Sequence, residues 1–176
     1  LSLTLGDELQ VLVENEGRIN YGVANDFKGI IGSVTYNSMI LLNWTMTGYP
    51  LDNHSKVEDL MAMLKRKYGN HQRTASFKSY LRSGPTIFHG EFSLNASEIA
   101  DTYVDPTMWG KGVMFINGFN LGRYWPLVGP QITLYLPREL LRVGSNTISM
   151  IELEKAPENG KIIFSATPNL DGINLI

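Results

Sequence analysis

The sequence predicts an all-β fold, an antiparallel sandwich or jelly roll, and three observations lead to this prediction. Strand-like segments recur at nearly regular spacing with turn residues between them, which is typical of such folds. Hydrophobic residues make up 43% of the 176-residue chain, enough to bury a sizeable core. The helices that alternate with strands in a doubly wound α/β fold are missing from the pattern.

Eight segments carry the strand signal. In Leu9–Glu14, the residues Leu9, Val11 and Val13 alternate onto one face, which is the period of a half-buried strand. A turn-like pair, Asn37-Ser38, separates the second segment from the third. The other segments are Gly29–Tyr36, Ile40–Met46, Thr86–Leu94, Val113–Asn117, Gln131–Leu136, Asn146–Leu153 and Lys161–Thr167.

One segment, Ser55–Gly69, predicts an amphipathic helix. Ser55 and Glu58 fit a capping box, in which each side chain satisfies a backbone N–H at the start of the helix. Gly69 suits the left-handed conformation that ends many helices. The apolar residues that fall on one stripe at helical spacing are Val57, Leu60, Met61, Leu64 and Tyr68.

This helix and the polar residues after it divide the chain into four parts. Residues 1–52 are too few for a whole sandwich, so we interpret them as the C-terminal part of a first β domain, truncated at its N-terminus. Residues 53–80 form a helical connector, 81–168 a second β domain and 169–176 a tail. Because the chain starts at Leu1 without a methionine, we expect a fragment or a processed product.

The composition argues against several classes of function. A net charge of −2 gives no electrostatic reason to expect nucleic acid or an anionic membrane as a partner. No apolar run reaches the roughly 18 residues that span a bilayer. The chain has no cysteine, and its three histidines lie in unrelated contexts, so we expect no metal site and no cofactor. Sequons at Asn43, Asn53 and Asn95 are candidates for N-glycosylation.

A hairpin is predicted at Asn117-Gly118, because this dipeptide tolerates the positive φ angles of a two-residue turn. The surrounding aromatic residues leave two interpretations open. They could form a platform that stacks on a pyranose, with Arg123 donating to its hydroxyl groups. Alternatively, they fill the core or a domain interface, and Arg123 bonds to loop carbonyls. The composition favours the second interpretation.

A second candidate site is the loop that follows the strand Leu9–Glu14. It carries Arg18, Asn20 and Tyr21 between two glycines. A loop after a buried strand often carries function, but a structural turn explains these residues equally well.

The carboxylates give little support for catalysis within this chain. A glycosidase needs two carboxyl groups, about 5 Å apart for retention of configuration and farther apart for inversion. Glu14 with Glu16, and Glu152 with Glu154, share a strand face at a period of two residues. We interpret both pairs as solvated strand ends.

Five stretches together resemble the C-terminal β domains of animal β-galactosidases of glycoside hydrolase family 35, the lysosomal enzyme and its close relatives. They are VLVENEGRINYG, DFKGIIGSV, WGKGVMFINGFNLGRYWP, GPQITLYLP and GSNTISMIELE. The resemblance covers Leu9–Met46 and Phe88–Thr167, whereas the connector Asn53–Arg82 matches poorly.

The resemblance implies an enzyme of three parts, an N-terminal catalytic (β/α)8 barrel followed by two galactose-binding-like β domains. Such enzymes release terminal β-linked galactose with retention, using two glutamates on the barrel. This chain would then hold no catalytic residue and would brace the barrel, its partner within the same protein. The alternative is an autonomous carbohydrate-binding module without a catalytic partner.

The resemblance also assigns roles to residues. It makes the hairpin residues structural, namely Asn117, Gly118, Gly122, Arg123 and Trp125. It places Arg18, Asn20 and Tyr21 at the galactose pocket or at a contact with the barrel. It implies a lysosomal or secreted protein that meets galactosides through the barrel, and a homo-oligomer is compatible with it.

Overall fold

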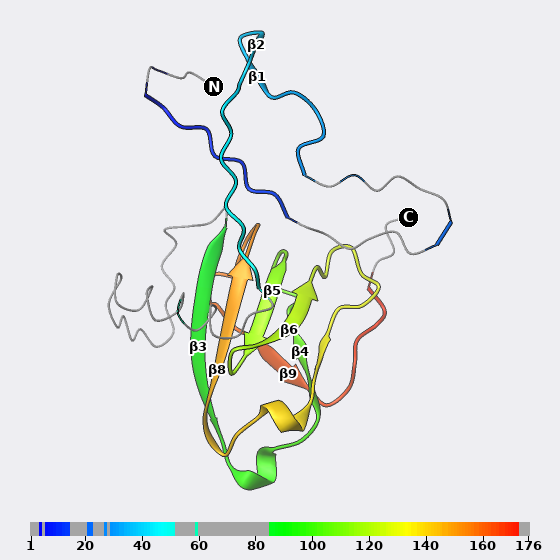
Figure 1. Ribbon diagram of the computed structural model, residues 1–176. Helices are drawn as coiled ribbons and strands as arrows, with labels where there is room; N and C mark the ends of the chain where they lie inside the picture. The colour runs from blue at the N-terminus through cyan, green and yellow to red at the C-terminus, as the bar shows by residue number, and fades with distance from the viewer. Residues whose placement is uncertain are drawn as a thin grey trace. The chain divides into compact units, whose positions relative to one another are not determined.

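The computed structural model describes Thr4, residues 6–14, Tyr21–Gly22, Phe27, residues 29–51, Asp59 and residues 85–172 (Figure 1). The chain divides into two units, Leu1–Gly48 and Tyr49–Ile176. Apart from Asp59, the predicted helix over Ser55–Gly69 lies outside the described residues.

The first unit holds one short hairpin. Strand β1 (Thr35–Tyr36) pairs with β2 (Met39–Ile40) across a turn in which Asn37 and Ser38 have φ angles of 47° and 66°. These positive angles confirm the turn that the sequence predicts at Asn37-Ser38.

The longer strands predicted for this unit are wrong in extent. Leu9–Glu14 forms no strand, and Gly29–Tyr36 and Ile40–Met46 are paired only next to the turn. The alternation of apolar residues is present, but a strand also needs a neighbour for its N–H and C=O groups. Among the described residues of this unit, only β1 and β2 supply each other with such a neighbour.

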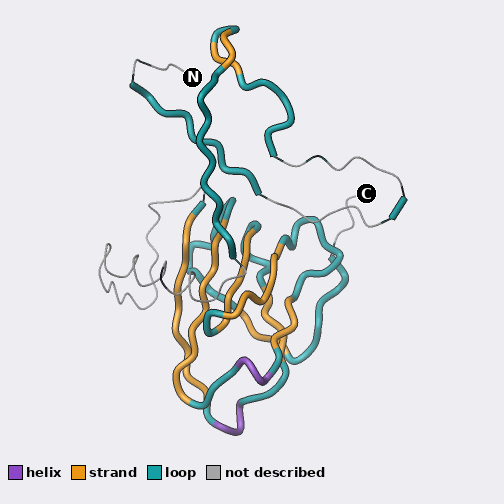
Figure 2. Tube along the Cα trace, viewed as in Figure 1, coloured by secondary structure: helices purple, strands orange, loops and turns teal. Residues whose placement is uncertain are grey.

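The second unit consists of two antiparallel sheets, in agreement with the predicted all-β fold (Figures 1 and 2). The four-stranded sheet has the order β3-β8-β5-β6, and the three-stranded sheet has the order β7-β4-β9. Two 3-10 helices, η1 (Ala96–Glu98) and η2 (Arg138–Leu140), lie in the connections. The strands are β3 (Thr86–Leu94), β4 (Thr102–Asp105), β5 (Gly112–Ile116), β6 (Phe119–Tyr124), β7 (Leu134–Leu136), β8 (Gly144–Glu152) and β9 (Ile163–Ser165).

The core of this unit lies between its two sheets. Met114 and Ile116 of β5 and Met150 of β8 meet side chains from the three-stranded sheet. Burying each large apolar side chain stabilises the fold by roughly 1.5–3 kcal/mol. Trp109 closes one side of the core, and its indole N–H donates to the Lys161 carbonyl at 3.0 Å. The remaining buried members of the cluster are Val104, Tyr124, Leu134 and Leu136.

The β5–β6 hairpin has the geometry that the sequence predicts. Asn117 and Gly118 occupy the turn with φ angles of 50° and 80°. The register shifts between Met114 and Phe115, so that a bulge bends the ladder in the middle of the hairpin.

Candidate functional site

The end of β8 carries a buried carboxylate. Glu152 is 1% exposed, which corrects the interpretation of this residue as a solvated strand end. Its Oε1 accepts backbone N–H groups of Lys111, Glu154 and Lys155 at 3.0, 2.8 and 3.2 Å. Its Oε2 accepts the Gly110 N–H at 3.1 Å and the Tyr124 hydroxyl at 2.9 Å. These hydrogen bonds tie the loop before β5 to the strand end of β8.

Two glycines make room for this carboxylate. A Cβ atom at Gly110 would lie 3.0 Å from the Glu152 Oε1 atom. A Cβ atom at Gly112 would lie 1.9 Å from the Ile151 carbonyl oxygen and 2.8 Å from the Tyr124 hydroxyl. A side chain at Gly112 would therefore push β5 and β8 apart, and one at Gly110 would displace the Glu152 carboxylate or the residues that follow β8.

Tyr124 stays protonated at this position. Burial raises the pKa of its phenol above the ordinary value, and the charge of Glu152 and the hydrogen bond to it raise the pKa further. Both oxygens of Glu152 accept hydrogen bonds from donors of its own chain, so Glu152 and Tyr124 act as a structural pair rather than as a catalytic acid and base. We call the carboxylate and its five donors the Glu152 lock.

A second polar cluster holds the hairpin turn. The side-chain amide of Asn117 donates to the Leu140 carbonyl at 2.7 Å and to Asn146 Oδ1 at 2.9 Å. Its Oδ1 accepts the Thr147 N–H at 2.9 Å. The buried Asn146 in turn accepts the Arg142 N–H at 2.8 Å. The turn is thereby fastened to β8 and to the loop that precedes it.

Of the aromatic residues around the hairpin, Phe119 is 50% exposed, whereas Tyr124 and Trp125 have contacts within this chain. Tyr124 is buried in the core, and the Lys111 ammonium lies 3.9 Å from the centroid of the Trp125 ring. The guanidinium carbon of the exposed Arg123 lies 5.8 Å from the same centroid. For Tyr124 and Trp125 this arrangement favours the scaffold interpretation, and the predicted bracing role of Arg123 stays a prediction.

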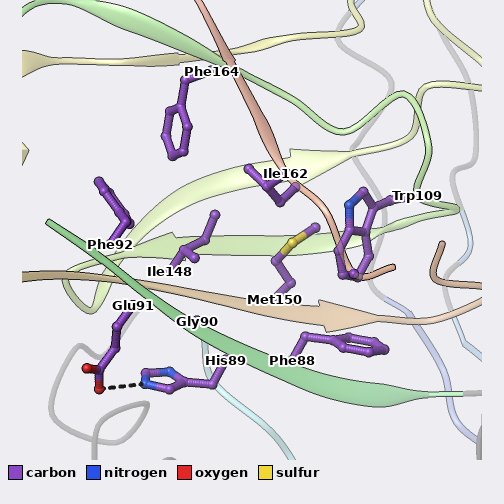
Figure 3. A pocket seen from close by; sticks show the side chains of 11 residues that line it. Phe88, His89, Gly90, Glu91, Phe92, Trp109, Ile148, Met150, Ile162 and Phe164 are labelled. Atoms are coloured by element: carbon purple, nitrogen blue, oxygen red, sulfur yellow. Dashed lines mark ion pairs between the residues drawn. The ribbon is translucent and has the colours of Figure 1, made fainter. Parts of the chain in front are cut away.

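A cavity of about 200 Å³ opens between the sheets beside β3 and β9 (Figure 3). Its lining is mainly apolar, and Phe88 meets Trp109 edge-on with ring centroids 4.9 Å apart. His89 and Glu91 point away from the phenyl rings on β3, and the His89 Nε2 atom lies 3.9 Å from a carboxylate oxygen of Glu91 (Figure 3). A galactose site needs hydrogen-bond donors and acceptors that converge on hydroxyl groups, so this apolar gap is a poor candidate. Other lining residues are Phe92, Ile148, Met150, Ile162 and Phe164.

The predicted loop site is only partly described. Tyr21 is 93% exposed, whereas Arg18 and Asn20 lie outside the described residues. The sequons at Asn43 and Asn95 are exposed, and Asn53 lies outside the described residues. No group of three or more metal-ligating side chains occurs in the described part of the chain. In the same part, no helix is long and apolar enough to cross a membrane.

Comparison with protein families gives two matches. A model described as "Beta-galactosidase, first all-beta domain" matches residues 1–52, and one described as "Beta-galactosidase, galactose-binding domain" matches residues 85–146.

Three relatives illustrate the similarity. Beta-galactosidase 17 of Arabidopsis thaliana is 42% identical over 156 residues, which cover 88% of this chain and 22% of that protein. The beta-galactosidase of Homo sapiens is 42% identical over 158 residues, with 86% of this chain and 23% of that protein covered. The beta-galactosidase of Felis catus is 40% identical over 182 residues, with 93% and 27% covered. The chain therefore spans about a quarter of the length of these relatives.

One solved structure aligns weakly with this chain. A β-glucuronidase from Ruminococcus gnavus, in complex with C6-substituted uronic isofagomine, aligns with a TM-score of 0.34 at 14% identity. The alignment covers 62% of this chain and 24% of that chain, and the score is too low to establish a shared fold.

Proposed function

The chain belongs to the β-galactosidases, of which it carries the first all-β domain and the galactose-binding domain, and on this premise we propose that it is the non-catalytic C-terminal portion of a family 35 enzyme. The proposed reaction of the whole enzyme is the release of terminal β-linked galactose with retention of configuration. We place the proposed catalytic barrel in the part of the protein that corresponds to the roughly three quarters of the relatives' length not spanned by this chain.

The observation that carries this proposal is the state of Glu152. It is the buried glutamate of the described region, and backbone N–H groups and Tyr124 take up both of its oxygens. A catalytic carboxyl must instead face substrate, with a second carboxyl at about 5 Å for a retaining enzyme. The two catalytic glutamates are therefore assigned to the barrel, and the β domains brace that barrel.

The exposed apolar residues of the first unit support the bracing role. Val11, Leu12, Ile31 and Met46 are exposed in the chain as it stands. Such residues gain stability when other parts of a protein cover them, at about 25 cal/mol per Å² of apolar surface. The rest of the first β domain and the barrel are the proposed cover.

Tyr21 is the residue that we place at the galactose pocket, with Asn20 orienting it or the sugar and Arg18 anchoring the loop. The exposure of Tyr21 leaves its ring available to another domain. In the intact enzyme, Tyr21→Phe should lower kcat/KM roughly tenfold with unchanged melting, because one lost hydrogen bond to substrate costs about 1–1.5 kcal/mol. Wild-type kinetics in this variant would leave the loop as an inter-domain contact.

The family assignment is consistent with a lysosomal or secreted protein that meets galactosides through its barrel. A secretory route would bring the exposed sequons at Asn43 and Asn95 to the glycosylation machinery.

A direct test compares glutamates of the two portions in the full-length enzyme. Hydrolysis of a chromogenic β-galactoside should be abolished by substitution of either barrel glutamate with glutamine. It should persist in Glu91→Gln and Glu154→Gln, two exposed glutamates of this chain. Absence of galactoside hydrolysis, or its loss in either control, would contradict the proposal. An enzyme without hydrolysis that still binds galactose through this chain would support the carbohydrate-binding module instead.

A further inference from the structure

Asn-Gly pairs occur twice in the chain, at Asn117-Gly118 and at Asn159-Gly160. An asparagine that precedes a glycine is chemically labile, because the backbone nitrogen of the glycine can attack the side-chain carbonyl carbon of the asparagine. Glycine favours this attack since it has no Cβ to block the close approach. The structure places the two pairs in different surroundings.

Asn117 is held away from this reaction. Its NH₂ group donates to the Leu140 carbonyl at 2.7 Å and to Asn146 Oδ1 at 2.9 Å, and its Oδ1 accepts the Thr147 N–H at 2.9 Å. The reaction requires the side chain to swing onto the Gly118 nitrogen and the NH₂ group to leave. Both donor bonds must therefore break first, at a half-buried position where their loss is costly.

Asn159 lies in an exposed turn. The turn runs from Pro157 to Gly160 and is closed by a hydrogen bond from the Gly160 N–H to the Pro157 carbonyl at 3.0 Å. The Asn159 side chain is exposed, and no described residue accepts a hydrogen bond from its NH₂ group. The attacking nitrogen gives up one backbone hydrogen bond of an exposed turn, and such bonds open locally at low free energy.

A backbone donor already lies on the carbonyl that is attacked. The Lys161 N–H donates to Asn159 Oδ1 at 3.0 Å. This bond folds the side-chain amide back over the peptide that follows it, where the Gly160 nitrogen lies. Negative charge develops on Oδ1 when the nitrogen adds to the carbon, and a positioned N–H group stabilises such charge. The turn thus favours the reaction that the hairpin prevents at Asn117.

We propose that Asn159 is a modification site, at which the side-chain amide is converted to aspartate and isoaspartate through a succinimide. The Gly160 nitrogen loses its proton to solvent and bonds to Cγ of Asn159, and the NH₂ group takes up a proton and leaves as ammonia. Water then opens the ring. Opening at the side-chain carbonyl gives aspartate, and opening at the main-chain carbonyl gives isoaspartate, in which the chain continues through Cγ.

The modification changes the anchor of Trp109. The Lys161 carbonyl accepts the indole N–H of Trp109 at 3.0 Å, and it follows Asn159 closely in the chain. Isoaspartate adds a carbon atom to the main chain between Asn159 and Gly160, so the turn no longer presents this carbonyl as before. Strand β9, Ile163–Ser165, comes directly afterwards at the edge of its sheet. Its amides should therefore exchange faster after modification.

The test is peptide mapping of the full-length enzyme after incubation in mildly alkaline buffer, both folded and in guanidinium chloride. Mass spectrometry measures the fraction of each Asn-Gly pair in which OH has replaced the side-chain NH₂, and fragmentation distinguishes isoaspartate from aspartate. The denatured sample gives the reactivity of the two pairs without the fold. The matched variant is Asn159→Gln, because glutamine keeps an amide group but forms the corresponding larger ring far more slowly.

In folded enzyme, Asn159 should react at least about tenfold faster than Asn117, because Asn117 must first give up its hydrogen bonds. In guanidinium chloride the two rates should become similar. Equal rates in folded enzyme, or no modification at Asn159, would overturn the proposal. A rate difference that persists in guanidinium chloride would also overturn it, since the fold would then not be its cause.

Amide exchange of β9 provides a second measurement. Exchange should become faster on incubation of wild type and should stay constant in Asn159→Gln. An equal change in both proteins would refute the effect on the Trp109 anchor. Neither measurement uses galactoside hydrolysis, so both are independent of the proposed function.

Discussion

Replacing Glu152 tests whether the hydrogen bonds to its buried carboxylate stabilise the domain. The side chain receives five hydrogen bonds, four from backbone N–H groups and one from Tyr124. Glu152→Gln keeps the shape but leaves one oxygen, and its NH₂ group must face donors. If the amide oxygen takes the place of Oε1, the NH₂ group faces Tyr124 and the Gly110 N–H. The Tyr124 hydroxyl can turn to accept, whereas the Gly110 N–H cannot.

The magnitude follows from these contacts. The Gly110 N–H also donates to the Lys155 carbonyl at 2.9 Å, which limits the loss at that group. We therefore expect Glu152→Gln to cost about 1–3 kcal/mol, the range for one buried polar group without a proper partner. Glu152→Ala removes every acceptor and leaves a cavity, so its cost should reach about 3–5 kcal/mol. One kcal/mol lowers the melting temperature by about 2–8 °C, depending on domain size.

The measurement is thermal unfolding of the full-length enzyme, combined with amide exchange over Gly144–Glu152 to localise the change. Glu154→Ala serves as the control, because Glu154 is exposed and neighbours the same strand end. The control should have the highest melting temperature, the glutamine variant an intermediate one and the alanine variant the lowest. If Glu152→Ala has the same melting temperature as the control and the amides of β8 exchange no faster, the hydrogen bonds to Glu152 do not stabilise the domain.

Three further predictions concern the same unit. Burial raises the pKa of Tyr124, so on raising the pH the unfolded state loses the phenol proton before the folded state does. The contribution of this shift to the free energy of unfolding is therefore full below about pH 10 and is lost as the pH rises further. In denaturant titrations between about pH 9 and pH 11, Tyr124→Phe should lose less unfolding free energy than wild type. Gly112→Ala should prevent normal folding because its Cβ would overlap the Ile151 carbonyl. Gly122→Ala meets open space and should cost about 1–3 kcal/mol for its φ of 132°, so equal melting of the two variants would refute this. Asn95→Gln should remove one glycan from protein expressed through a secretory pathway, seen as a mobility shift that glycosidase treatment abolishes in wild type, and an unshifted band would refute attachment at Asn95.

The sequence predicts what is set locally. Asn117-Gly118 and Asn37-Ser38 form turns because the conformations they need are encoded in the dipeptides themselves. The strands of the second unit are recognisable because their alternation coincides with real partners in the sheets. The exception is β4, whose four residues Thr102–Asp105 are too few to show a clear period.

The Glu152 lock depends on residues that are far apart in the sequence, and for that reason it could not be predicted from the sequence. Glu152 follows an alternating strand and precedes charged residues, which is the usual pattern of a solvated end. Its burial depends on Gly110, which leaves space for the carboxylate, on Gly112, which lets β8 and the Tyr124 hydroxyl approach closely, and on Tyr124, which donates to the carboxylate. The spacing of glycines in Trp109–Gly112 was the available signal, but a glycine pair does not say which side chain will approach it.

A substitution of the turn residue Asn117 can distinguish a bracing role of this domain from a direct part in catalysis. Asn117→Asp keeps the size of the side chain and an acceptor for the Thr147 N–H. It also turns an amide donor into a carboxylate oxygen that faces two other oxygens, the Leu140 carbonyl at 2.7 Å and Asn146 Oδ1 at 2.9 Å. Asn146 cannot relieve this contact by rotating its amide, because its own NH₂ group already donates to the Arg142 and Gly144 carbonyls.

We therefore expect Asn117→Asp to lose at least about 2 kcal/mol of stability, which corresponds to buried polar groups left without donors. If these domains brace the barrel, the loss should appear as a lower melting temperature and a shorter half-life at elevated temperature. Active-site titration of the surviving enzyme should give the wild-type kcat, because the turn contributes position and no chemistry. A fall in kcat per titrated site with unchanged melting would mean that the hairpin shapes the active site itself, and the bracing role would have to be abandoned.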